Sequence, residues 1–424
     1  MGDHDTYWSA DGSYLPVIEP HTKAKHQILA DYIKKWIVTL CGNNIGQKKT
    51  VTLIDGFCGG GMYRDLESDA HLWAGSPIQM IQMVEKGLET VKYEKHKPNY
   101  QLDTKFIFID NKQEHLDCLK KQIQNAGLEK YLNDPDKCEF ICGEFEDLSA
   151  NLIAAVRKRK GSSFFFLDPF GYTQVSMRSI REIIALEKSE IIFTFMIDFI
   201  RRFLSDRERS LKRFEDVLEA DGYYGLANSS DIDTSSQQQY LRNESLRLFR
   251  NRGGARYVYS FALLPNKTLV KYYLIHLATN PTAQKVIKNA LWVHNTIDLA
   301  YQFRYGVYGL GFRTPDYYER DQRNFLIEDG NFRASIESLS EDLMPIIYDA
   351  EDGLTFDELH LKTIQTNPSP TQHYIECLKE QREMGEIEVL RRGRITKAKN
   401  LQPGDIIIKS QQCKLFDFKS FKHV

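Results

Sequence analysis

The feature that most constrains the fold of this 424-residue chain is a series of short, almost wholly apolar runs separated by helix-like segments. The strand-like runs are residues 51–54, 105–109, 139–142, 163–167 and 190–195, and the helix-like segments are 21–40, 76–88, 112–126, 148–158 and 176–186. Strands that are apolar at successive positions are typical of sheets buried on both faces by helices. The alternation therefore predicts a doubly wound, Rossmann-like α/β fold.

The segment after this alternation predicts how the sheet ends. Residues 199–255 are charged and helix-prone, with a polar stretch at 228–239, and predict a helical insertion with a mobile loop. Residues 257–264 and 268–277 follow as strand-like runs joined by Pro265-Asn266-Lys267, and predict an antiparallel hairpin that closes the sheet. We therefore expect an N-terminal arm and helix (1–50) and a main domain (51–198 and 256–300) interrupted by the insertion.

A second domain is expected from residue 335 to residue 424. Helices are predicted at 336–348, near 356–364 and at 370–384, and short strands at 387–390 and 405–409. A basic segment, 391–404, joins the two strands. Three short helices followed by a basic-tipped hairpin predict a winged-helix-like domain.

Composition narrows the class of protein. The net charge is −2, from 56 basic and 58 acidic residues, so nucleic acid would be contacted only through local clusters such as 157–160, 201–202 and 391–394. No apolar run approaches the eighteen or so residues of a membrane span, and the polar N-terminus is unlike a signal peptide. Seven cysteines without regular spacing argue against a disulfide framework, and Cys138 and Cys142 are expected to be buried thiols. These features predict a cytoplasmic protein that binds no membrane.

The first strand runs into a glycine-rich turn, Asp55-Gly56-Phe57-Cys58-Gly59-Gly60-Gly61. Glycines at a strand end allow a ligand to approach the backbone closely, which suits a nucleotide-like cofactor at the carboxyl edge of a sheet. The spacing D-x-F-x-G-x-G resembles motif I of class I methyltransferases. That resemblance implies S-adenosylmethionine as the cofactor, with the glycines facing its methionine part and Asp55 engaging its ammonium group or a bound water.

The next strand ends supply further polar candidates. Asp110, followed by Asn111, ends the second strand, where a carboxylate could accept hydrogen bonds from both hydroxyls of a ribose. Glu144 and Phe145 follow the third strand and are candidates for the adenine amino group and ring. Ser76 is expected to cap the helix that follows the glycine turn and to offer backbone N–H groups to the cofactor carboxylate.

The fourth strand ends in Asp168-Pro169-Phe170-Gly171-Tyr172. This sequence resembles the D-P-P-[YF] box of amino-group methyltransferases, in a form similar to that of tRNA guanine-N2 dimethyltransferases. Asp168 and the carbonyl group of residue 167 or Pro169 could accept the two protons of an exocyclic amine, while Phe170 or Tyr172 stacks on a flat base. Alignment of the methyl donor and the amine would supply most of the rate enhancement.

Several stretches together resemble the three-Cys-motif partner proteins, a prokaryotic family of predicted methyltransferases. These stretches are residues 21–26 (HTKAKH), 54–63, 75–77 (GSP), 167–172 and 272–292, so the resemblance spans roughly residues 8–295. It implies that His21, Lys25 and His26 lie near the cofactor cleft, and that a radical-type protein with a three-cysteine motif is a partner. Residues 58–60 are Cys-Gly-Gly, where the family tends to have Ala-Gly-Pro.

The sequence leaves three functions open. The first is N-methylation of an exocyclic amine of RNA or DNA, with His21, Lys25, Arg201 and Arg202 as substrate-binding residues and Asp168, Pro169, Phe170 and Tyr172 as the catalytic group. The second is methylation of a protein or peptide together with the radical-type partner. The third is a cofactor sensor that binds DNA through the winged helix, although Glu376, Glu380 and Glu383 would repel phosphates.

Overall fold

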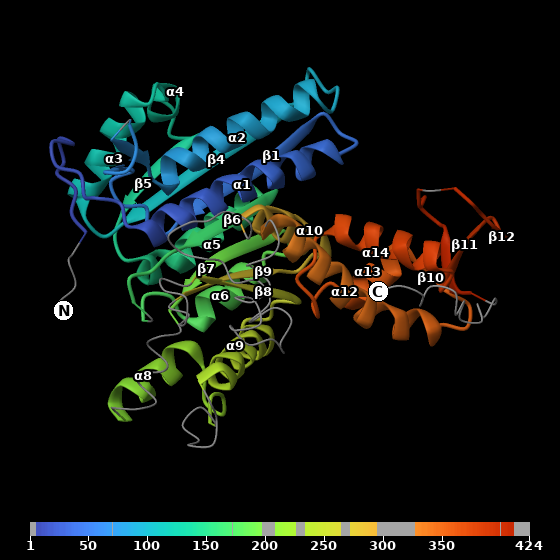
Figure 1. Cartoon of the computed structure of the whole chain (residues 1–424). Helices are drawn as coiled ribbons and strands as arrows, with labels where there is room; N and C mark the ends of the chain where they lie inside the picture. Colours follow the sequence, from blue (N-terminus) through green and yellow to red (C-terminus); the bar gives the residue numbers. More distant parts are fainter. Residues whose placement is uncertain are drawn as a thin grey trace. The chain divides into compact units, whose positions relative to one another are not determined.

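The computed structural model describes residues 6–69, 71–171, 173–196, 208–225, 234–263, 272–294, 327–398 and 400–410. The chain divides into two compact units, Met1–Arg304 and Tyr305–Val424. Figure 1 shows the course of the chain through both units. Each unit is described by itself.

Unit 1 is built on a mainly parallel sheet that contains seven strands among the described residues. The order across the sheet is β5 (Cys138–Cys142), β4 (Gln101–Asp110), β1 (Lys48–Asp55), β6 (Ser162–Leu167), β7 (Ser189–Phe195), β9 (Tyr272–Ala278) and β8 (Tyr257–Leu263). The five strands from β5 to β7 are parallel to one another. Strand β9 runs antiparallel between β7 and β8. The predicted α/β class, parallel sheet and closing hairpin are therefore confirmed.

The strand order creates a switch point between β1 and β6. From β1 the chain moves outward to β4 and β5, and it then returns to the other side of β1 to form β6 and β7. The connections at β1 and β6 consequently leave the sheet in opposite directions. Ligands of open α/β sheets bind outside the carboxyl ends of the strands at such a point.

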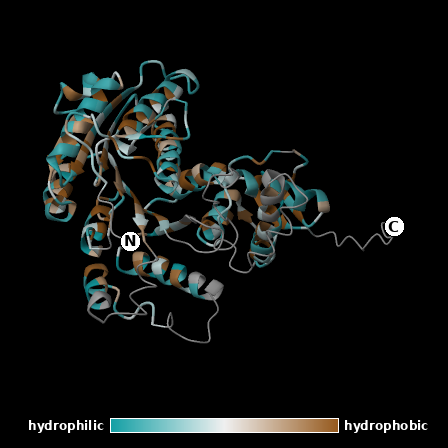
Figure 2. Cartoon of the chain, turned by 60° about the vertical axis from the view of Figure 1, so that its left-hand side comes forward, coloured by the Kyte–Doolittle hydropathy of each residue, from teal (hydrophilic) through white to brown (hydrophobic). Residues whose placement is uncertain are grey.

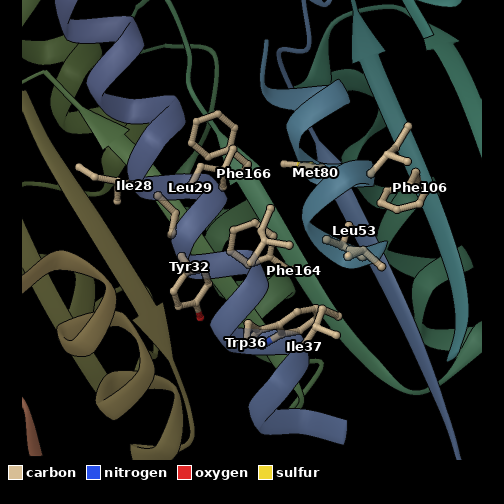
Figure 3. Packing of buried hydrophobic residues seen from close by; sticks show 14 of the residues in the cluster. Ile28, Leu29, Tyr32, Trp36, Ile37, Leu53, Met80, Phe106, Phe164 and Phe166 are labelled. Carbon is tan, nitrogen blue, oxygen red and sulfur yellow. The ribbon is translucent and has the colours of Figure 1, made fainter. Parts of the chain in front are cut away.

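One face of the sheet is covered by α1 (Pro20–Gly42), α2 (Ser76–Tyr93), α3 (Gln113–Asn125) and α10 (Pro281–His294), which share a single apolar core with the strands. Figure 3 shows Tyr32 and Trp36 of α1 close to Phe164 of β6, and Leu29 of α1 close to Phe166. Phe165, between these two strand residues, is also fully buried. Because successive strand residues point to opposite faces, Phe165 packs on the other side.

Helices α5 (Phe145–Arg159) and α6 (Met177–Ile184) cover the opposite face of the sheet. The two helices contact each other, and α6 also contacts β7. Leu167 of β6 and Phe145 of α5 both lie against Gly56. The helices of unit 1 carry both hydrophobic and hydrophilic residues (Figure 2), as expected for helices that cover a buried sheet.

Several local features were not predicted. Among the described residues, the hairpin of β2 (Met62–Arg64) and β3 (Leu72–Ala74) and the short helix α4 (Glu129–Leu132) have no counterpart in the sequence analysis. In the predicted insertion the structure has α8 (Glu208–Leu218) and α9 (Thr234–Asn251). The polar stretch expected to be a loop is helical from Thr234 onward, and its earlier residues lie outside the described part of the chain.

The prediction of two buried thiols is wrong for one of them. Cys138 is buried at the start of β5, but Cys142 at the end of this strand is exposed. Strand β5 is at the edge of the sheet, so its last residue has less cover than the ends of the central strands.

Unit 2 is a small helical unit with an antiparallel sheet. Its elements in chain order are α12 (Ile327–Tyr348), β10 (Leu354–Thr355), α13 (Phe356–Thr363), α14 (Thr371–Met384), β11 (Ile387–Arg391), β12 (Arg394–Ile395) and β13 (Ile406–Lys409). The sheet order is β10-β13-β11-β12. Helices α13 and α14 and the two main strands lie close to their predicted ranges. Helix α12 ends where predicted but begins at Ile327, before the predicted start at residue 336, and β10 and β12 were not expected. In the described residues of both units, no helix is long and apolar enough to span a bilayer.

Candidate cofactor and acceptor site

Three aspartates converge at the carboxyl edge of the central strands. Asp55 ends β1, Asp110 ends β4, and Asp168 directly follows β6. Strand β1 pairs with both β4 and β6, so the three residues flank the switch point. The structure therefore brings together the strand ends that carry the predicted cofactor and catalytic residues.

The glycine turn after β1 is held mainly by backbone hydrogen bonds. Gly56 N–H donates to Phe166 O (3.0 Å), Cys58 N–H to Ile109 O (2.9 Å) and Gly75 N–H to Gly61 O (2.8 Å). These bonds attach the turn to β6, to β4 and to the start of α2.

Asp55 lies beneath this turn and is fully buried. Its Oδ1 accepts a hydrogen bond from Phe57 N–H at 3.2 Å. Burial raises the pKa of Asp55 to about 7, against hydrogen bonds from Ser76 and from Phe57 N–H that lower it, and the charges of Asp168 and Asp110 raise it further. This placement stabilises the turn from below, and the predicted contact of Asp55 with a cofactor stays a prediction.

The helix after the turn begins differently from the prediction. The N-cap of α2 is Gly75, and Ser76 is the first helical residue, followed by Pro77. The expected capping role of Ser76 is therefore wrong. Ser76 is buried, and the donors available at this end are the backbone N–H groups of the first turn.

Asp110 is bound by protein donors on both oxygens. Its Oδ2 accepts from Gly59 N–H (3.0 Å), and its Oδ1 accepts from Lys112 N–H (2.9 Å) and is 2.9 Å from His115 Nδ1. A carboxylate has about four lone-pair sites, so one further hydroxyl can still be accepted. Asp110 thus orders the glycine turn in addition to any predicted contact with a ribose.

Glu144 and Phe145, the residues predicted to bind adenine, lie in two different environments. Asn111 and Glu144 are both exposed, and Asn111 Nδ2 donates to Glu144 Oε1 at 2.9 Å. Phe145 is 1% exposed and packs against Gly56, with its ring centroid 5.9 Å from that of Phe57. Phe57 is half-buried, so it is the more accessible aromatic of this pair.

Asp168 forms an ion pair with Lys25 from the first turns of α1. Lys25 Nζ is 2.5 Å from Asp168 Oδ2, and the two side chains are 7% and 18% exposed. Burial raises the pKa of Asp168, but the charge of Lys25 and its hydrogen bond outweigh this effect and hold the pKa below its usual value. Asp168 is consequently an ionised carboxylate that ligands can still reach.

The residues after Asp168 turn outward. Pro169 is buried, whereas the Phe170 side chain is 66% exposed. Gly171 N–H donates to Gln174 Oε1 at 3.1 Å and closes the turn. Tyr172, Arg201 and Arg202, which were predicted to act in catalysis or substrate binding, lie outside the described residues.

Two aromatic contacts at this edge were missed by the sequence analysis. Tyr272 begins β9, whose antiparallel direction places the start of this strand level with the end of β7. His21 stacks on Tyr272 with ring centroids 5.1 Å apart, and Lys25 Nζ is 5.8 Å from the Tyr272 ring. The sequence analysis could have found Tyr272, because the second strand of the predicted antiparallel hairpin begins at the edge where the parallel strands end.

His26 is buried next to Lys25 and is held in its neutral form. Trp73 Nε1 donates to His26 Nδ1 at 3.2 Å, which assigns the ring proton of His26 to Nε2. Burial, with the nearby charge of Lys25, lowers the pKa of His26 to about 3. Lys25 is therefore the cation that the α1 sequence HTKAKH brings to Asp168.

No family model and no curated protein matches this sequence. Among solved structures, protein LPL1258 from Legionella pneumophila has a TM-score of 0.35 at 9% identity, covering 64% of this chain and 91% of its own. A putative caffeoyl-CoA O-methyltransferase from Staphylococcus aureus has a TM-score of 0.30 at 11% identity (62% and 86% covered). PKMT2 from Rickettsia typhi, solved in complex with AdoHcy, has a TM-score of 0.23 at 12% identity (58% and 45% covered). These likenesses are too distant to carry an argument about function.

Proposed function

We propose that this protein is an S-adenosylmethionine-dependent methyltransferase that N-methylates an exocyclic amino group of a nucleic-acid base. The observation that carries the proposal is Asp168, an ionised and partly accessible carboxylate, beside the exposed ring of Phe170 at the switch point of the sheet. The glycine turn flanks the same point.

The cofactor half of the proposal rests on the β1 turn and the sheet. The antiparallel hairpin β8–β9 closes an otherwise parallel sheet, as expected for the class I methyltransferase fold. Gly59 and Gly61 have φ values of 58° and 77°, a region that favours glycine. The first turn of α2, which follows this glycine turn in the chain, presents backbone N–H groups to an anionic group such as the cofactor carboxylate.

The acceptor half rests on the chemistry of aromatic amines. The lone pair of such an amine is conjugated with its ring, so it is a weak nucleophile until hydrogen-bond acceptors orient it. The Asp168 carboxylate accepts one amine hydrogen, and the carbonyl oxygen of Leu167 or Pro169 accepts the second. The sulfonium of S-adenosylmethionine would supply the methyl group, and Asp168 would accept the proton that the amine nitrogen loses on methylation. The exposed ring of Phe170 stacks on the flat base.

Unit 2 supports a role in substrate contact. Its order of elements, α12-β10-α13-α14-β11-β13, is consistent with a winged-helix-like domain. At the β11–β12 turn, Arg392 and Arg394 are exposed. Arg391 is instead bound to Asp405 at 2.7 and 2.8 Å. We propose that the two exposed arginines contact phosphates.

One observation favours a second candidate function, methylation of a protein or peptide. On α14, Lys379 lies 3.3 Å from Glu376, and Glu383 is exposed. Cations lie beside Glu376 and Glu380, so Glu383 is the acid of this helix that would most repel phosphates and suit a protein partner, which could include the radical-type protein implied by the family resemblance.

The first test is cofactor binding. Titration calorimetry of the purified full-length chain with S-adenosylmethionine should give micromolar binding, about −8 kcal/mol. No binding, with or without added nucleic acid, would sink the proposal.

The second test identifies the acceptor. Tritiated cofactor is incubated with the protein and with RNA, DNA or protein fractions of a cell extract, each with and without nuclease or protease treatment. Label that nuclease removes supports a base as the acceptor, and label that only protease removes supports the second candidate. Salt-dependent binding of duplex DNA without any methyl transfer would point to a cofactor sensor.

A further inference from the structure

The N-terminal arm, residues 6–18, lies against the segment that contains the glycine turn. Trp8 is 1% exposed, and its Nε1 donates to Met62 O at 2.6 Å. Further along the arm, Arg64 N–H donates to Pro16 O and Ile18 N–H donates to Arg64 O, both at 2.8 Å. The arm is thus bonded to the chain immediately after the turn at more than one point.

The indole ring of Trp8 occupies the space next to Gly59 and Gly60. A methyl group on Gly59 would lie 2.9 Å from Trp8 Cη2, and one on Gly60 would lie 2.3 Å from Trp8 Cγ. Real Cβ atoms essentially never come this close to another heavy atom. Trp8 therefore packs directly on the backbone of the turn.

Gly60 differs from its two neighbours in its backbone. Gly59 and Gly61 have positive φ values, so each favours glycine whatever surrounds it, but Gly60 is not among the residues with positive φ. The backbone at position 60 would accept alanine. The contact with Trp8 is what excludes a side chain there.

The same indole ring also contacts His115, which is bound to the carboxylate partner of the turn, Asp110. Its centroid lies 4.9 Å from that of His115, in an edge-to-face arrangement. His115 Nδ1 is 2.9 Å from Asp110 Oδ1, and Asp110 Oδ2 accepts the N–H of Gly59. The turn therefore contacts both the indole ring and the Asp110 carboxylate, and His115 links these two groups to each other.

We infer that Trp8 is a positioning residue for the cofactor turn, so that the cofactor site is complete only when the arm lies on Gly59 and Gly60. This inference rests on the proposed methyltransferase function. Glycine-rich segments lose the most conformational freedom when they become ordered. A ligand that packs against such a segment binds more tightly when the protein has already ordered it.

The inference is tested by titrating the full-length chain with S-adenosylmethionine. Trp8→Ala should weaken binding about tenfold, equivalent to about 1.4 kcal/mol, and Trp8→Phe should restore most of the affinity because a ring again covers the turn. Tyr14→Ala is the matched control, since Tyr14 is an aromatic residue of the same arm that is 50% exposed. The affinity of the Tyr14→Ala variant for S-adenosylmethionine should equal that of the wild type. Melting curves of each variant confirm that the titrations are made on folded protein.

A double-mutant cycle tests the contact independently of the cofactor. Gly60→Ala should lower the melting temperature of the wild type but have little effect in the Trp8→Gly background, because Trp8 Cβ, which alanine would keep, lies 2.7 Å from the position of a methyl group on Gly60. An equal loss in both backgrounds would overturn the inference, and so would wild-type affinity in a folded Trp8→Ala variant. If the wild type itself binds no S-adenosylmethionine, the proposed function fails and this inference fails with it.

Discussion

The turns after β1 and β6 lie at the same edge of the sheet, but the chain stabilises them by different means. The β1 turn is bonded through its backbone to β4, β6 and α2, and it is covered by Trp8. The β6 turn carries an ion pair between Asp168 and Lys25, and it exposes Phe170. A rigid backbone surface suits a cofactor of constant shape, whereas an accessible charge and an exposed ring suit an acceptor that enters and leaves.

The two aspartates at these turns show the difference most clearly. Asp55 is fully buried and has a raised pKa, while Asp168 is partly accessible and has a lowered pKa because Lys25 is beside it. The cation from α1 therefore decides which carboxylate is ionised and available. If this comparison is correct, changes at the β6 turn should affect methyl transfer, and changes at the β1 turn should affect cofactor binding and stability.

The largest effect is expected for Asp168→Ala. Methyl transfer should fall about a thousandfold, equivalent to about 4 kcal/mol in the barrier, because the amine loses both its orienting acceptor and its proton acceptor. Affinity for S-adenosylmethionine should stay close to that of the wild type. The measurement is transfer of a tritiated methyl group, with the exposed Asp147→Ala on α5 as the control. Transfer at the wild-type rate would refute the catalytic assignment.

Asp55→Asn should change how stability depends on pH. The pKa of Asp55 is raised from 3.8 to about 7 in the folded protein, so its contribution to stability is complete below about pH 4 and is lost as the pH rises to about 7. At ~1.4 kcal/mol per unit of pKa, the rise in the pKa of Asp55 limits this pH-dependent contribution to the free energy of unfolding to about 4 kcal/mol.

Asparagine does not titrate and can still accept the Phe57 N–H bond. Urea unfolding should therefore show Asp55→Asn gaining stability relative to the wild type between about pH 5 and about pH 8. If the difference in free energy of unfolding between Asp55→Asn and the wild type is the same at about pH 5 and about pH 8, Asp55 is already ionised in the folded protein.

Lys25→Met should lower the free energy of unfolding by about 2 kcal/mol, less than for a fully buried pair because the Asp168 side chain is 18% exposed. The loss should be greatest near neutral pH. It should shrink as the pH falls and Asp168 becomes protonated, because a carboxylate with a lowered pKa contributes its stability only while it is ionised. The double variant Lys25→Met/Asp168→Leu removes both charges and should recover most of the loss, and failure to recover would assign Lys25 a different role.

The smallest effect on stability is expected for Phe170→Ala. An exposed aromatic contributes little to folding, so the free energy of unfolding should change by less than about 0.5 kcal/mol, while the KM for the acceptor rises. Phe145→Ala is the contrasting variant. Loss of this buried ring, which packs against the β1 turn, should lower the free energy of unfolding by about 3 kcal/mol. If Phe170→Ala leaves the KM unchanged, stacking on this ring is not part of acceptor binding.

Much of the fold could be predicted because the responsible pattern is local. Strands β1, β4, β5, β6 and β7 are apolar enough to identify in the sequence, and α1 has regular helical spacing. The elements that were missed, such as β2, β3 and α4, are three or four residues long. Segments of this length have too few residues to show a period, so tertiary contacts decide their conformation.

The candidate site also contains some features that the sequence could predict and others that it could not. Asp168 and the glycine turn could be found from the sequence because residues adjacent in the chain form each motif. The pairing of Lys25 with Asp168 joins residues 143 positions apart, and no local pattern encodes it. Trp8 is also distant from the turn that it covers, 51 positions before Gly59, and it has no motif of its own.

The sequence by itself determined the α/β class, the parallel strands and the positions of the acidic strand ends, since these follow from hydrophobic period and from residues next to one another. Only the tertiary structure decided that Asp55 lies beneath its turn, that Asp168 has a cation partner, and that the N-terminal arm covers Gly59 and Gly60. The physical reason is that burial and charge pairing depend on distances in space. Helix α1 and the arm approach the sheet edge only when the whole domain has packed.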